Sequence, residues 1–253
     1  IGDIGEVVVT VPANFPNKAR VETTKAAKMA KLNAKLIDEP TAAALYYAYQ
    51  SGFSLQGNYV VYDLGGGTFD VSVVKLDGRD VKVLATDGIP RLGGDDFDTT
   101  LQEMIQKRYH KDTGEELEQW DLTKTAAEDY KKSLSKRDVK IRAVRKRYAV
   151  TQDEFEEAIS SRIAESEMIC QRVLEAAKLT ISDIESVFLV GGSTRIPLVQ
   201  ESVKRAFDME PTATINVDEV VALGASIYAA IQEMKKGDQS ELNAAQKAVL
   251  DKV

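Results

Sequence analysis

YVVYDLGGGTFDVSVV, residues 59–74, is the stretch of this sequence that decides the fold. Val60 and Val61 belong to an apolar run that ends on Asp63, and three glycines, 65–67, follow after one residue. Thr68 then opens a run in which apolar and polar side chains alternate. An apolar run, a glycine turn and an alternating run predict two strands joined by a tight connection.

The same stretch carries groups that suit an anionic ligand. Three glycines let the backbone adopt positive φ angles and approach a ligand closely, with N–H groups that can donate. Asp63 can orient a hydrated divalent cation, because Mg²⁺ usually keeps several of its waters in proteins. Thr68 and Asp70 add a hydroxyl and a second carboxylate just past the turn. An ordinary glycine-rich hairpin and a phosphate site both remain open at this point.

Composition narrows the class of protein. With 253 residues, 43% of them hydrophobic and 29% charged, the chain is globular and can bury a large core. A net charge of −7 argues against nonspecific binding of nucleic acid. The chain has one cysteine, Cys170, and one histidine, His110, so it cannot form an intramolecular disulfide or a Cys/His zinc cluster. We expect Cys170 to lie in the core and His110 to lie at a helix end. No apolar run is long enough to span a bilayer, so we expect neither a nucleic-acid nor a membrane partner.

The spacing of apolar residues and the positions of proline and glycine predict the elements before and after the glycine turn. A strand is predicted over 6–11, a helix over 17–32, a short strand at 36–37 and a Pro40-led helix over 41–49. Asp77-Gly78 is a turn signal that leads to a third strand over 81–85. The glycine turn therefore belongs to an antiparallel meander of three strands.

The second half of the chain is predicted to begin with a charged, helical part. We expect helices over 97–109 and 123–134, a hairpin pairing 139–144 with 147–150, and a long helix that starts at the capping-box pattern 151–154 and ends near 178. A strand over 187–190, helices over 197–207 and 220–232, and a polar tail that is helical over 242–253 complete the prediction.

The two ends of the chain read as copies of one unit. The front has a strand, a proline-led helix, a short strand and DEPTAAALYYA (38–48), and the back has the same series ending in DEVVALGASIYAA (218–230). The back copy is preceded by the three-strand meander, whereas the front copy is not. A duplicated α/β unit that has lost its first meander explains this asymmetry, although two alanine-rich helices can also resemble each other by chance.

Two glycine turns suggest one ligand. The turns 63–68 and 191–195 both follow a strand, and open α/β sheets bind ligands at the carboxyl ends of their strands. The first turn suits phosphates, and the second could admit a flat ring with the Arg195 guanidinium stacked over it. One helical face collects four polar residues at i, i+3, i+4 and i+7: Glu128, Lys131, Lys132 and Ser135. Taken alone, such a stripe is typical of a solvated face.

The motifs together resemble the heat-shock protein 70 (DnaK-type) chaperones. Six of them occur in the order found in that family: DEPTAAA (38–44), DLGGGTFD (63–70), LGGDDFD (92–98), EDYKKSLS (128–135), VGGSTRIP (190–197) and NVDEVVALGA (216–225). The resemblance implies an α/β fold, an actin-like ATPase (ribonuclease H-like) lobe with an inserted α+β subdomain. It divides the chain into the end of the lobe I base (1–52), the lobe II base (53–92 and 160–232), an inserted outer subdomain (93–159) and a polar tail (233–253).

The resemblance also implies the roles of individual residues. Glu39, Asp63, Thr68 and Asp70 would act in hydrolysis, and Asp63 and Asp70 would hold Mg²⁺ through water. The residues that would contact the nucleotide are Gly65, Gly66, Gly67, Thr68, Glu128, Lys131, Lys132, Ser135, Gly191, Gly192, Ser193, Arg195 and Asp218. The implied cofactors are ATP or ADP with Mg²⁺, and K⁺ is a further candidate ion.

The implied function is that of the ATP- and ADP-binding part of a chaperone, whose intact domain hydrolyses ATP to control the binding of unfolded polypeptides. The implied partners are unfolded clients, bound by a substrate-binding domain that this sequence lacks, a J-domain co-chaperone and a nucleotide-exchange factor, and the implied location is cytoplasmic. The family's first phosphate loop and its hydrolysis-promoting lysine have no counterpart here, so we expect a fragment with negligible turnover.

Several features differ from the family pattern. The segment between Ser135 and Thr151 is shorter than usual, which puts contacts with an exchange factor in doubt, and the tail lacks the usual hydrophobic linker. Lys35 and Asp38 stand where bacterial members usually carry Arg and Asn, on a surface used by J-domain partners. An actin-like nucleotide-dependent switch or assembly module without chaperone activity is the alternative, and a sugar kinase of the same superfold is a weaker one.

Overall fold

A four-stranded sheet is built around the glycine turn. In the computed structural model, which describes residues 6–214 and 216–236, strands β3 (Gln56–Leu64), β4 (Phe69–Asp77) and β5 (Asp80–Ile89) form an antiparallel meander. Strand β8 (Ile184–Val190) joins it parallel to β3, and the strand order is β5-β4-β3-β8. The predicted strand, glycine turn and strand are therefore confirmed, as is the turn at Gly78, which adopts a φ of 61°.

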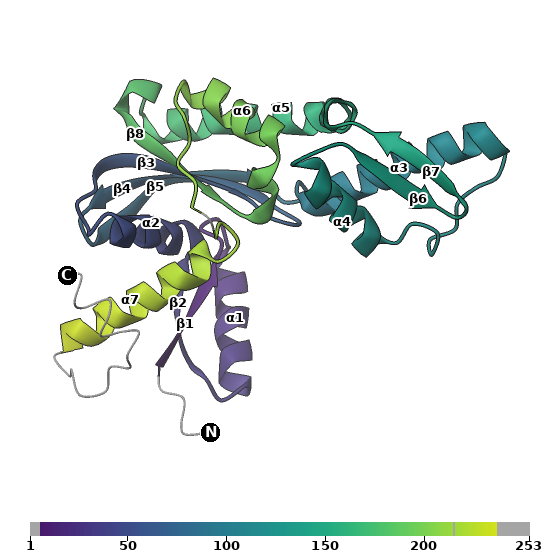
Figure 1. The fold of residues 1–253 in the computed structure, drawn as a ribbon. Helices are drawn as coiled ribbons and strands as arrows, with labels where there is room; N and C mark the ends of the chain where they lie inside the picture. The colour runs from purple at the N-terminus through teal and green to yellow at the C-terminus, as the bar shows by residue number, and fades with distance from the viewer. Residues whose placement is uncertain (1–5, 215, 237–253) are drawn as a thin grey trace.

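Helices cover both faces of this sheet, which explains why four successive residues of β3, 59–62, are buried. Helix α5 (Gln152–Ala177) packs on one face with α6 (Pro197–Phe207) beside it, and α2 (Glu39–Gln50) packs on the other (Figure 1). Val60 and Tyr62 contribute to the core under α5, whereas Tyr59 and Val61 contribute to the core under α2. Successive residues of one strand thus enter different cores, as the period of two requires.

Aromatic side chains join α2 to the sheet. The rings of Tyr47 and Phe188 are stacked with their centroids 4.1 Å apart, and Tyr59 stacks on Phe188 at 4.9 Å. The Tyr47 hydroxyl donates a hydrogen bond of 2.8 Å to the carbonyl oxygen of Leu189. Helix α2 is consequently fixed to β8, an element 142 residues later in the sequence.

The opposite side of α2 belongs to a second, smaller unit. Strands β1 (Glu6–Val11) and β2 (Asn33–Asp38) pair in parallel, joined by helix α1 (Asn17–Met29). Helix α7 (Val220–Lys236) lies across α2 and β1 (Figure 1). Residues from β2, α2 and α7 share one small core: Ile37, Ala42, Leu45, Ile227 and Ile231.

Contact between α2 and α7 depends on a glycine. A Cβ atom at Gly224 would lie 1.7 Å from the Ala42 carbonyl oxygen, so the two backbones touch where only glycine fits. Helix α7 contacts α2 and β1, and Val220 at its start packs in the core under the four-stranded sheet. Small residues on both helices allow that approach, and it is not visible in either helix alone.

The remaining elements extend away from the sheet (Figure 1). They are α3 (Gly94–Thr113), α4 (Lys124–Leu134), the hairpin of β6 (Val139–Ala143) and β7 (Lys146–Val150), and the N-terminal part of α5. Their core includes Phe97, Leu101, Ile141 and Phe155. The predicted capping box is confirmed, because the Thr151 hydroxyl accepts from the Glu154 N–H and the Glu154 carboxylate accepts from the Thr151 N–H.

Other predictions have mixed outcomes. Helix α6 has the predicted bounds, Cys170 is buried as expected, and His110 lies in the last turn of α3, where its Nδ1 is 3.0 Å from Glu116 Oε1. The strand predicted at 36–37 is three times longer, and the helix predicted over 242–253 lies outside the described residues. Within the described part of the chain, no helix is both long enough and apolar enough to cross a membrane.

Candidate functional site

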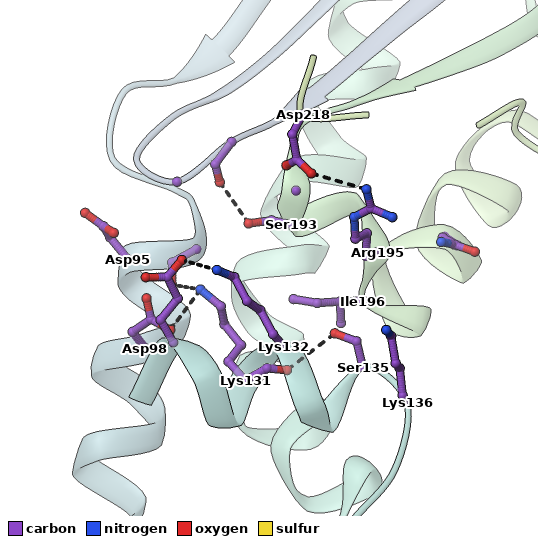
Figure 2. Close-up of a pocket in the computed structure, with 16 residues that line it drawn as sticks. Asp95, Asp98, Lys131, Lys132, Ser135, Lys136, Ser193, Arg195, Ile196 and Asp218 are labelled. Atoms are coloured by element: carbon purple, nitrogen blue, oxygen red, sulfur yellow. Dashed lines mark hydrogen bonds and ion pairs between the residues drawn. The ribbon is translucent and has the colours of Figure 1, made fainter. Parts of the chain in front are cut away.

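A cavity of about 720 Å³ opens between five segments of the chain (Figure 2). They are the glycine turn after β3, the start of α3, helix α4, the turn after β8 with its short 3₁₀ helix η2 (Gly192–Arg195), and the loop before α7, which carries Asp218. The predicted site residues that line it are Gly65, Gly66, Glu128, Lys131, Lys132, Ser135, Gly192, Ser193, Arg195 and Asp218. The structure therefore gathers both glycine turns and the polar stripe of α4 around one space.

The glycine turn is held by the N-terminus of α3. The Gly94 N–H donates to the Gly65 carbonyl at 3.0 Å, and the Asp95 N–H donates to the Gly66 carbonyl at 2.7 Å. A Cβ atom at Gly93 would lie 2.5 Å from the Gly66 oxygen, so this approach requires glycine. The shape of the turn thus depends on the helix that follows the meander.

The second turn is fastened directly to the first. The Ser193 hydroxyl donates a 2.8 Å hydrogen bond to the carbonyl oxygen of Gly65, 128 residues earlier (Figure 2). Gly191 adopts a φ of 86° and passes so close to Leu64 that a Cβ atom would lie 2.4 Å from the Leu64 oxygen. Gly191 consequently supports the turn and does not line the cavity.

Arg195 and Asp218 face each other at one side of the cavity. Arg195 Nη2 lies 3.2 Å from Asp218 Oδ2, and the side chains are 49% and 60% exposed. Because the pair is solvated, it restrains the guanidinium weakly. Ile196, which is buried, adds an apolar surface next to this planar cation.

Helix α4 presents two kinds of polar side chain to the cavity. Lys131 is buried, with Nζ 2.8 Å from both Asp98 Oδ1 and the Gly94 carbonyl oxygen. Burial raises the pKa of Asp98, and the Lys131 ammonium opposes that shift. Lys132 is exposed and pairs with Glu128 at 2.8 Å, one turn away. The polar stripe is therefore not simply a solvated face, because Lys131 is used to fix α3 to α4.

Three carboxylates lie around a separate small crevice of about 10 Å³, which is lined in part by Glu39, Asp63 and Asp70. Burial, followed by the charges of Glu39 and Asp70, raises the pKa of Asp63 to about 7. Burial also raises the pKa of Glu39, as do the charges of Asp70 and Asp38. The pKa of Asp70 is raised by burial, against hydrogen bonds from Asn14 and Thr68 that lower it.

Such a cluster fits a hydrated divalent cation. Three partly buried carboxylates repel one another, and a cation held among them would neutralise their negative charge. Among the described residues, no group of three His, Cys, Asp or Glu side chains is arranged to bind an ion directly. Mg²⁺ usually keeps several of its waters in proteins, so these side chains would contact such an ion through water molecules.

Not every site residue could be identified in advance. Gly67 and Thr68 are exposed at the tip of the glycine turn and do not line the large cavity. Six lining residues were not predicted: Gly94, Asp95, Asp98, Lys136, Ile196 and Gln200. The first three lie in the motif 92–98 and Ile196 lies in the motif 190–197, neither of which assigns these members a role, and Lys136 and Gln200 lie outside the motifs.

Comparison with known proteins identifies the relatives of the chain. A family model described as Hsp70 protein matches residues 1–243. A chaperone protein HscA homolog from Histophilus somni is 43% identical over 243 residues, which are 95% of this chain and 39% of the relative. The homolog from Photobacterium profundum is 42% identical over 95% of this chain and 39% of its own length.

A third relative, the HscA homolog from Acinetobacter baylyi, is 43% identical over 230 residues, which are 89% of this chain and 37% of the relative. The chain thus spans about two fifths of the length of the curated relatives it matches.

Proposed function

The chain belongs to the Hsp70 family, and from that premise we propose that it is the ATP- and ADP-binding part of a DnaK-type molecular chaperone. The intact chaperone would hydrolyse ATP to control its hold on unfolded polypeptides. The observation that carries the proposal is the 2.8 Å hydrogen bond between Ser193 and Gly65, because it joins two glycine turns from distant parts of the chain at one cavity. A ligand with a flat ring and a phosphate tail needs both turns at once.

The two halves of the nucleotide are assigned to different elements. The adenosine would lie in the large cavity, between the Arg195 guanidinium and Ile196 on one side and Glu128, Lys132 and Ser135 of α4 on the other. Arginine suits this place because its planar guanidinium stacks on aromatic rings. The phosphates would extend toward Gly65–Thr68, whose glycines permit close approach of backbone N–H groups.

The Mg²⁺ ion that accompanies the nucleotide would lie at the crevice lined by Glu39, Asp63 and Asp70. Asp63 and Asp70 would orient the waters of a Mg²⁺ ion, and Glu39 would help to position the attacking water; K⁺ is a further candidate ion. Bound Mg²⁺ supplies charge neutralisation for the phosphates. Asp63 and Gly65 are two residues apart at one strand end, so the metal and phosphate groups would be held by the same turn.

Lys131 has a different part in this proposal from the other residues of its helix. Its ammonium donates to the Gly94 carbonyl and pairs with Asp98, so it would act on the ligand by positioning α3 and the glycine turn that α3 holds. Gly191 would act in the same indirect way.

The proposal includes the finer architecture that the family implies. The four-stranded sheet with α5 and α6 would be the base of lobe II, an actin-like, ribonuclease H-like lobe. The β1–β2 unit would be part of the lobe I base, and residues 93–159 the inserted outer subdomain. Unfolded clients, a J-domain co-chaperone and a nucleotide-exchange factor are the partners that the whole protein would have.

Isothermal titration calorimetry with adenosine, ADP and ATP tests the two half-sites separately. If stacking contributes about 1–2 kcal/mol, Arg195→Ala weakens the binding of all three ligands roughly five- to thirtyfold. Thr68→Ala weakens ADP and ATP but leaves adenosine almost unchanged, because its hydroxyl would face phosphates. Lys82→Ala, an exposed lysine on β5, serves as the control that changes none of them. Unchanged adenosine affinity in Arg195→Ala would show that the ring site is wrongly placed.

A further inference from the structure

The β6–β7 hairpin concentrates positive charge in an acidic protein. Residues 136–147 carry a net charge of +6, whereas the whole chain carries −7 and the remaining residues together −13. Asp138 is the one acidic residue of the segment. Its seven basic residues are all exposed: Lys136, Arg137, Lys140, Arg142, Arg145, Lys146 and Arg147.

Strand pairing brings part of this charge onto one face. Arg142 lies directly opposite Arg147 in the antiparallel register, and Lys140 is two residues before Arg142 on the same side of β6. Ile141 and Ala143, which alternate with Lys140 and Arg142 along β6, point to the opposite side of the strand and are buried. Like charges directly opposite each other destabilise a strand pair, so this arrangement costs stability unless an anion compensates it. Lys140, Arg142 and Arg147 together form the basic face.

The chain itself supplies little compensation. Among the described residues, Lys146 is the one member of the seven with an ion pair, to Asp112, and the Asp138 carboxylate accepts from the Gln152 N–H. Arg142 donates from Nε to the Val144 carbonyl oxygen at 3.2 Å. The fold therefore holds this guanidinium through a neutral acceptor rather than through a carboxylate.

Another like-charged pair in the same molecule shows the contrast. Lys75 lies directly opposite Lys82 in the β4–β5 ladder, and Asp77 lies opposite Asp80 two residues further along the same two strands. Lys75 and Lys82 each have a carboxylate two residues along the strand, whereas the basic face has one such carboxylate, Asp138, which accepts from the Gln152 N–H. The difference makes Lys75 and Lys82 a matched control for the hairpin.

We propose that the basic face binds a short acidic segment of a partner protein. Five-residue strands span roughly 17 Å, so the face matches a few carboxylates rather than a long polyanion. A nucleic-acid duplex or an anionic membrane extends well beyond the hairpin and would be repelled by the acidic remainder of the chain. Arginine forks bind carboxylates in a bidentate manner, which gives Arg142 and Arg147 a role beyond general attraction.

This surface is distinct from the nucleotide site proposed above, although Lys136 connects the two because it also lines the large cavity. An acidic segment on the hairpin would therefore lie beside the cavity without entering it. The hairpin stands at the outer end of the molecule, away from β1 and α7 (Figure 1).

Fluorescence anisotropy with a labelled decaglutamate peptide tests the proposal on the full chain at about 50 and 200 mM NaCl, on either side of physiological ionic strength. The triple variant Lys140→Ala/Arg142→Ala/Arg147→Ala is expected to bind the peptide at least about tenfold more weakly, and the control Lys75→Ala/Lys82→Ala within about twofold of the parent. Affinity falls at the higher salt concentration, since the contacts are exposed charges. ADP affinity, measured in parallel, stays unchanged in the triple variant because the substituted residues do not line the cavity.

Replacing both arginines by lysine keeps the charge but removes the bidentate fork, so this variant is expected to bind the peptide more weakly than the parent and more tightly than the alanine triple variant. The proposal is overturned if the alanine triple variant binds the peptide as well as the parent, or if the lysine variant loses binding to the same extent as the alanine one. It is also overturned if a DNA duplex of equal charge, or phosphatidylserine vesicles, bind the basic face more tightly than the peptide does.

Discussion

Lys131 and Asp98 form a buried ion pair between α4 and α3, with Nζ 2.8 Å from Oδ1 and side chains that are 9% and 2% exposed. Lys131 also donates to the Gly94 carbonyl, and Gly94 in turn donates to Gly65. A chain of polar contacts thus leads from α4 through the start of α3 to the glycine turn. We infer that this pair determines where the glycine turn lies.

Removing one member of the pair should destabilise the protein more than removing both. Asp98→Leu leaves a buried ammonium without a counter-charge, and we expect the free energy of unfolding to fall by about 3–5 kcal/mol. Lys131→Met is the other single variant of the cycle. The double variant Asp98→Leu/Lys131→Met leaves no buried charge and should lose less than the single variant. Urea unfolding in a double-mutant cycle measures both, with the exposed Glu128–Lys132 pair as a control whose removal costs about 0.5 kcal/mol. Additive losses in the cycle would contradict this prediction.

Gly93→Ala should damage the phosphate half of the site. The added methyl group would lie 2.5 Å from the Gly66 oxygen and 2.6 Å from the Gly67 nitrogen, so the glycine turn must shift. If overpacking costs about 1–3 kcal/mol of binding, ADP affinity falls roughly five- to 150-fold, and adenosine affinity changes less. Calorimetry compares this variant with Thr99→Ala, an exposed position of the same helix. Equal losses for adenosine and ADP would argue against a local effect on the turn.

Stability should fall with rising pH when Mg²⁺ is absent, because ionised Asp63 is less favourable in the folded than in the unfolded state. Its pKa rises from 3.8 to about 7 on folding, so its favourable contribution is complete below about pH 4 and is lost as the pH passes about 7. Asp63→Asn removes this dependence. We expect the free energy of unfolding of Asp63→Asn, relative to that of the parent protein, to increase by about 2–4 kcal/mol between about pH 4 and pH 8. Chemical denaturation across that range checks it, and an advantage that does not vary with pH would refute the assignment.

Gly224→Ala should loosen α7. The new Cβ atom would lie 1.7 Å from the Ala42 oxygen, which is backbone and cannot rotate away, so α2 and α7 must separate. We expect α7 amides to exchange with deuterium at least about tenfold faster and the four-stranded sheet to be little affected. Ser226→Ala, on the exposed side of the same helix, is the matched control. Unchanged exchange in α7 would mean that the helix accommodates the methyl group by bending.

Local signals predicted the elements well. The meander, the capping box at Thr151 and helix α6 all follow from residues that are near one another in sequence, and each is confirmed. Periodicity and turn chemistry act over a few residues, which is why such features can be read directly. Strand β2 was underestimated because its pairing with β1, rather than its own apolar content, sets its length.

The site was only partly predictable because its geometry depends on distant pairs. Lys131 looks like a member of a solvated stripe until Asp98, 33 residues earlier, is seen beside it. Ile196 enters the cavity only because the turn after β8 is fastened to Gly65 by Ser193. The position of α7 likewise follows from a close contact at Gly224 that neither helix reveals. Tertiary contacts of this kind leave no periodic trace in the sequence.

The position of α2 between two cores has a consequence for biosynthesis. The Tyr47 hydroxyl is hydrogen-bonded to the Leu189 carbonyl oxygen, and the Ala42 backbone packs against Gly224. Residues near position 45 therefore reach all of their final contacts only after about 180 further residues have been synthesised. At ribosomal rates of about 5–20 residues per second, an apolar helix would wait roughly 10–40 s for its partners. During translation the apolar face of α2 therefore stays without its final partners until the second half of the chain has been made.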